Sequence, residues 1–98
     1  MTEGMFNEGF AAGVQSFLEG LPEEISNLIE LQRNIGFVPT TGDAKEDFAE
    51  GFVMGAAACI VRLGGTSNGE LALNMAALWV HSKYESKDDL WEKFNGVG

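Results

Sequence analysis

Apolar residues recur at every third or fourth position along most of the chain, and this spacing predicts amphipathic helices. The first apolar stripe predicts a helix over residues 3–20 and consists of Phe6, Phe10, Val14 and Phe17, with Leu21 directly after the helix. A second stripe predicts a helix over residues 22–36, because Pro22 suits a first helical turn and Gly36 suits a C-cap. No segment alternates apolar and polar residues between hairpin turns, so we expect no sheet.

Capping signals mark the start of three further helices. A Ser, Thr or Asp followed three residues later by Glu is typical of a helix N-terminus, because the first side chain accepts from free backbone N–H groups. The two pairs are Asp43 with Glu46, for a helix to Leu63, and Ser67 with Glu70, for a helix to about Tyr84. Ser86 precedes a short predicted helix over residues 87–95.

Two segments of the chain share one pattern. Residues 6–13 and 48–55 both read F-x-E-G-F-x-x-G, at an offset of 42 residues. A capped helix follows each copy, so we interpret the chain as an internal duplication with repeats over 3–36 and 43–84. The predicted fold class is therefore all-α: one domain, residues 1–98, forming a small helical bundle of two helical hairpins plus the short C-terminal helix.

Four glycines stand inside predicted helices, at Gly9, Gly13, Gly51 and Gly55. Each costs about 0.5–1 kcal/mol relative to alanine, which indicates a compensating gain. We expect these glycines to mark close helix packing, with a phenylalanine ring seated over each of them. A glycine-lined groove for a small ligand is the alternative.

The segment from Leu71 to Val80 is apolar nearly all round, with Asn74 as its one polar residue. Such a helix is either central in a bundle or covered by another chain. Because a bundle of this size rarely surrounds one helix, we expect a homodimer or a partner surface here.

The charge is strongly negative and unevenly placed. Fifteen acidic and six basic residues give a net charge of −9. Residues 1–50 hold ten acids and two bases, a net −8, whereas residues 51–98 hold five acids and four bases, a net −1. Such a chain repels nucleic acid and anionic membranes and attracts basic surfaces. The alternative is that the charge serves solubility alone.

Residues that could carry chemistry lack the partners they would need. Gly64 and Gly69 have the spacing of a phosphate-binding loop, but Glu70 stands where its lysine should be. Cys59, the single cysteine, lies in an apolar run, and His81 is the one histidine. A row of carboxylates at the start of the third long helix is explained by capping and solvation. We therefore expect no enzyme, no metal site and no cofactor.

The start of the chain lacks the pattern of a signal peptide, and no apolar stretch is long enough to span a bilayer, so we expect a cytoplasmic protein. Our functional hypothesis is a binding protein that occupies a basic surface of a larger protein, which could itself bind nucleic acid. The chain would be a coarse nucleic-acid mimic and would not bind DNA or RNA itself. The expected contact residues are acidic side chains and two tryptophans of an exposed aromatic end: Glu19, Glu23, Glu24, Glu30, Glu46, Asp47, Glu50, Trp79 and Trp91. We expect Tyr84 to belong to the same aromatic end.

This profile of small size, acidity and no cofactor motif resembles that of small phage-encoded inhibitors, including anti-CRISPR proteins. The resemblance is one of profile, and no functional residues carry over from it. Two alternatives stay open: a homo-oligomeric helical adaptor, and a binder of small molecules or an enzyme that uses the glycine-lined groove.

Overall fold

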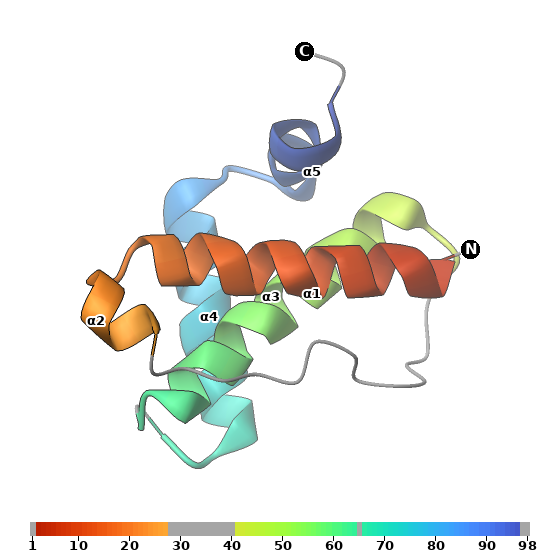
Figure 1. Cartoon of the computed structure of the whole chain (residues 1–98). Coiled ribbons are helices and arrows are strands. Elements are labelled where there is room, and N and C mark those ends of the chain that lie inside the picture. The colour runs from red at the N-terminus through yellow and green to blue at the C-terminus, as the bar shows by residue number, and fades with distance from the viewer. Residues whose placement is uncertain (1, 28–40, 65, 97–98) are drawn as a thin grey trace.

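The computed structural model of the chain describes residues 2–27, 41–64 and 66–96 (Figure 1). Five helices occupy these residues: α1 (Thr2–Glu19), α2 (Glu23–Ser26), α3 (Ala44–Arg62), α4 (Gly69–Lys83) and α5 (Lys87–Asn95). The described residues form no strand. The all-α prediction is therefore confirmed. The part of the second predicted helix beyond residue 27 lies outside the described residues.

Helix α3 is the centre of the bundle and packs against α1, α4 and α5. In Figure 1, α1 crosses in front of α3, and α4 lies behind. Contacts between α1 and α3 advance in the same direction along both helices, from Gly9 with Phe48 to Gly13 with Phe52, so the pair is parallel. Helices α3 and α4 form an antiparallel hairpin, because the second half of α3 packs on the first half of α4 while Phe48 and Phe52 cluster with Val80 near the end of α4.

The four helical glycines lie where α1 and α3 cross. A Cβ on Gly9 would overlap the carbonyl oxygen of Phe48, and a Cβ on Gly51 would overlap that of Phe6. The facing group is thus the phenylalanine backbone, and the expectation that each ring would cover a glycine is wrong. Both helices carry G-x-x-x-G, a spacing that lets helix backbones approach closely. The glycine-lined groove does not form, because the facing backbone fills that space.

The contacts at this crossing are reciprocal. A shift of 42 residues turns the contact of Gly9 with Phe48 into the contact of Gly51 with Phe6. It likewise exchanges the pairing of Gly13 with Phe52 for that of Gly55 with Phe10. The crossing is therefore locally two-fold symmetric. The internal duplication itself stays a hypothesis.

Two apolar clusters fill the space around α3. The first joins small side chains of α3 and α4, among them Ala56, Ala57, Ala72 and Ala76, with Ile60. The second joins larger side chains from α3, α4 and α5, namely Phe48, Phe52, Val80 and Leu90. Within the described ranges, no helix has the length and apolar content needed to cross a membrane.

The helix ends follow the capping signals with one shift. Asp43 caps α3 and its side chain accepts from the N–H groups of Lys45 and Glu46, at 2.9 and 3.2 Å. Helix α4 begins one residue later than predicted, because Asn68 rather than Ser67 accepts from the N–H group of Leu71. The cap of α5 is Ser86, as predicted.

Candidate functional site

The acidic residues predicted to form one face lie at two ends of the α1–α3 pair. Glu46 and Glu50 belong to the first two turns of α3, level with the first half of α1. Glu19 ends α1, and α2 follows it with Glu23 and Glu24. Because the helices are parallel, eleven residues of α1, or about 16 Å, separate the two groups along the helix axis. Glu30 lies outside the described residues.

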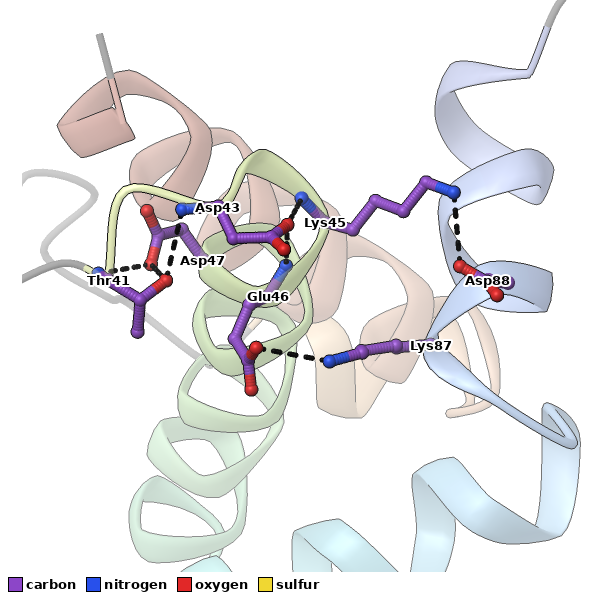
Figure 2. Close-up of polar contacts among 7 residues, drawn as sticks. All are labelled: Thr41, Asp43, Lys45, Glu46, Asp47, Lys87 and Asp88. Atoms are coloured by element: carbon purple, nitrogen blue, oxygen red, sulfur yellow. Dashed lines mark hydrogen bonds and ion pairs between the residues drawn. The ribbon is translucent and has the colours of Figure 1, made fainter.

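Asp47 belongs to the interior and makes no surface contact. Its side chain is 0 % exposed, and its Oδ1 accepts from the backbone N–H and the hydroxyl of Thr41, both at 2.9 Å (Figure 2). The hydroxyl oxygen of Thr41 accepts in turn from the N–H of Asp43 at 3.1 Å. The interpretation of Asp47 as a partner contact is therefore wrong, because its carboxylate fixes the turn that leads into α3.

Two ion pairs tie the start of α3 to the start of α5 (Figure 2). Glu46 binds Lys87 and Lys45 binds Asp88, each at 3.1 Å between nitrogen and oxygen. The hydrogen bond to Glu46, and then its negative charge, raise the pKa of Lys87. Glu46, the glutamate of the predicted capping box, is therefore bound to a lysine of α5. This lysine already neutralises the negative charge of Glu46.

The outer side of α1 and α2 carries the remaining acidic surface. Glu8, Glu19, Glu23 and Glu24 are all exposed there. Residues 1–27 contain no lysine or arginine, and neither ion pair between described residues includes these four carboxylates. Glu8 was not among the predicted contacts. Its spacing of eleven residues from Glu19, three helical turns, could have revealed it.

The predicted exposed aromatic end is largely packed inward. Trp79, Tyr84 and Trp91 are each partly buried. The Trp79 ring stacks on Phe52 at 6.1 Å between centroids, and Trp91 meets Phe48 edge-on at 5.6 Å. The expectation of an exposed aromatic end is therefore wrong, because Trp79 of α4 packs against Phe17 and Phe52, and Trp91 of α5 packs against Phe48.

A groove of about 500 Å³ runs between α3, α4 and the start of α5. Its apolar lining includes Val53 and Leu73, and its charged or polar lining includes Glu50, His81 and Lys87. His81 stands exposed in the last turn of α4, the helix-end position that the sequence indicated. The groove combines an apolar base with polar edges of mixed charge.

The remaining groups that the sequence marked for chemistry are structural. Cys59 is 0 % exposed, and burial raises its pKa to about 11, so the thiol is protonated at neutral pH. Gly64, with a φ of 78°, follows the end of α3, and Asn68 begins α4, so the glycine-rich segment joins two helices. Among residues 2–27, 41–64 and 66–96, no group of three or more His, Cys, Asp or Glu side chains could hold a metal ion.

Comparisons with protein-family models, with curated proteins and with solved structures find no match to this chain.

Proposed function

We propose that this chain is a non-enzymatic binding protein that docks on a basic surface of a larger protein through the outer side of α1 and α2. The observation that carries the proposal is the exposed group formed by Glu8, Glu19, Glu23 and Glu24, in a segment without a single basic residue. Below, these four residues are called the α1–α2 acidic surface. The proposal assigns the protein to the cytoplasm.

Charge of one sign on one surface favours association with an oppositely charged partner. Such clustering raises association rates by about 10–10³-fold at low salt. Screening limits its range to about 8–10 Å at physiological ionic strength, so the partner must bring its own charge close to α1 and α2. Exposed carboxylates that have no ion-pair partner among the described residues are best suited to this role, since they break no ion pair there when they bind.

The spacing of these carboxylates fits a basic protein patch better than it copies nucleic acid. Glu8 and Glu19 lie on one side of α1, three turns or about 16 Å apart. Duplex DNA carries one charge per about 1.7 Å of its axis, which is far denser. The proposed mode of action is therefore occupancy: the chain covers a basic site, and nucleic acid that uses the same site competes with it. Small phage-encoded inhibitors, including anti-CRISPR proteins, share this profile, so phage genes beside the coding sequence would support the proposal.

The experiment compares two charge-matched variants in a pull-down from lysate of the native host. One reverses Glu19, Glu23 and Glu24 to lysine. The control reverses three exposed acids at the other end of the chain, Glu85, Asp89 and Glu92, and changes the net charge equally. We expect the control to retain the partner and the first variant to lose it, while both keep their helical circular dichroism.

The salt dependence of the captured interaction supplies a second measurement. Binding should weaken between about 0.05 and 0.5 M salt, mostly through the association rate. If both variants lost the partner equally, the interaction would depend on the net charge of the chain and not on the α1–α2 acidic surface. An interaction that survives the first triple reversal and 0.5 M salt would show that the α1–α2 acidic surface serves solubility.

A further inference from the structure

Helix α4 has its apolar side chains arranged in an unusual order, with small residues inward and large residues outward. Ala72 and Ala76 are at most 1 % exposed and pack on α3. On the other side, Leu71, Met75 and Leu78 are 48, 39 and 72 % exposed. These three residues follow one another at steps of four and three, so they form a single stripe along the helix. Below, they are called the α4 stripe.

The α4 stripe is unsuited to a partner that is recruited by charge. Helix α4 contains one acid, Glu70, and one lysine, Lys83, whereas the first fifty residues carry a net −8. A second copy can approach this nearly neutral helix while the acidic halves of the two chains stay apart. A basic partner would find little to bind here and much to bind on α1 and α2.

The stripe and the polar side chains beside it are self-complementary when two copies pack antiparallel. A two-fold axis at Met75 brings the Met75 side chains of the two copies together and places Leu71 of one copy near Leu78 of the other. Glu70 and His81 lie on the same flank of the stripe, at opposite ends of the helix. The axis therefore brings Glu70 of each copy beside His81 of the other, and the opposed helix dipoles favour the same orientation.

We infer that this chain forms a homodimer in which the α4 stripes of two copies pack antiparallel about a two-fold axis at Met75. The dimer buries the most exposed large apolar side chain of the described residues, Leu78. It leaves both α1–α2 acidic surfaces free, so this inference goes beyond the proposed function and does not depend on it. Each dimer presents two such surfaces to its surroundings.

Sedimentation equilibrium of the purified chain at micromolar concentration tests the dimer. The expected mass is twice the chain mass of 10.5 kDa. Leu78→Glu should weaken the dimer by at least about 30-fold, because it places two unpaired carboxylates in the interface core. Ile25→Glu makes the same change at a residue of α2 that is 41 % exposed, and this control should remain dimeric. Circular dichroism should be unchanged in both variants.

A disulfide tests the position of the axis. In a Cys59→Ala background, Met75→Cys should form a covalent dimer under mild oxidation, because the two positions face each other across the axis. Ala11→Cys, at an exposed position of α1 outside the α4 stripe, should form no disulfide-linked dimer under the same conditions. The inference is overturned if the unmodified chain is monomeric at about 0.1 mM, if Leu78→Glu leaves the dimer intact, or if both cysteine variants cross-link equally. These measurements need no partner protein, so their failure leaves the proposal for α1 and α2 untouched.

Discussion

The carbonyl oxygen of Phe48 occupies the space that a Cβ on Gly9 would need, and the carbonyl oxygen of Phe6 occupies the same space at Gly51. Two helix backbones can approach this closely only where one of them lacks a side chain. The glycine Cα–H groups then lie against carbonyl oxygens, a weak contact that recurs at helix interfaces. The close approach offsets the low helix propensity that made these glycines conspicuous in the sequence.

Adding one methyl group at this crossing should destabilise the fold. Gly51→Ala and Gly9→Ala should each lower the free energy of unfolding by about 1–3 kcal/mol, because the clash is with backbone that must move. The two-fold arrangement predicts similar losses for both variants, and Gly51→Leu should lose at least as much. Urea denaturation measures these values. Gly4→Ala is the control: nothing lies within 4 Å of its added Cβ, so the stability should stay the same or rise slightly. If the Gly51 variants matched this control, the close crossing would be refuted.

The buried carboxylate of Asp47 should contribute to stability through Thr41. Asp47→Ala leaves the Thr41 N–H and hydroxyl without their acceptor, and a loss of about 1–3 kcal/mol is expected. A double-mutant cycle with Thr41→Val should show coupling, since both residues belong to one hydrogen-bonded unit. Glu50→Ala, which removes an exposed acid from the same helix, serves as the comparison and should change little. Additive losses at Asp47 and Thr41 would contradict the assignment.

Cys59 should resist thiol reagents until the chain unfolds. Its sulfur is buried, and burial raises its pKa from 9.0 to about 11. The folded chain therefore holds this proton more tightly than the unfolded chain. The resulting stability is fully present below pH 9.0 and is lost as pH rises toward about 11. Denaturation midpoints measured across this window should fall more steeply for the unmodified chain than for Cys59→Ala. Rapid labelling of the native thiol at pH 8 would show that Cys59 is accessible.

The position of the α4 cap can be tested by a neighbouring pair of substitutions. Asn68→Ala removes the acceptor of the Leu71 N–H group and should cost about 0.5–2 kcal/mol. Ser67→Ala alters the residue that the sequence had indicated, and the unfolding free energy should stay nearly constant. The opposite order of effects would restore Ser67 as the cap.

The helices of this chain could be predicted because their signals are local. Periodic apolar residues predicted α1, the Asp43 cap predicted the start of α3, and Ser86 predicted the start of α5. The one shifted cap arose where two good capping residues, Ser67 and Asn68, stand side by side. The G-x-x-x-G segments indicated a close crossing, but single-helix periodicity does not tell whether a glycine faces a ring or a carbonyl.

The candidate binding surface was harder to predict because it depends on how the helices are placed relative to one another. Glu46 and Asp47 are adjacent in sequence, yet one binds Lys87 of another helix and the other turns inward to Thr41. The partial burial of Trp79 follows from its packing against Phe52 of α3, and that of Trp91 follows from the packing of α5 on α3. No local pattern encodes either contact. Leu78 is exposed because Ala72 and Ala76 occupy the side of α4 that packs on α3, and the nearly uniform apolar pattern of this helix does not indicate which side that is.

The parallel arrangement of α1 and α3 has a kinetic consequence. Residues that meet at their crossing stand about 42 positions apart, whereas the α3–α4 hairpin joins residues that are close in sequence. Closing the longer loop costs more entropy before any contact forms, and folding slows as contacts become less local. We therefore expect the α3–α4 hairpin to form early, with the docking of α1 as the slow step. Substitutions of the glycines at the crossing should then mainly raise the unfolding rate. Substitutions of the alanines between α3 and α4 should mainly lower the folding rate.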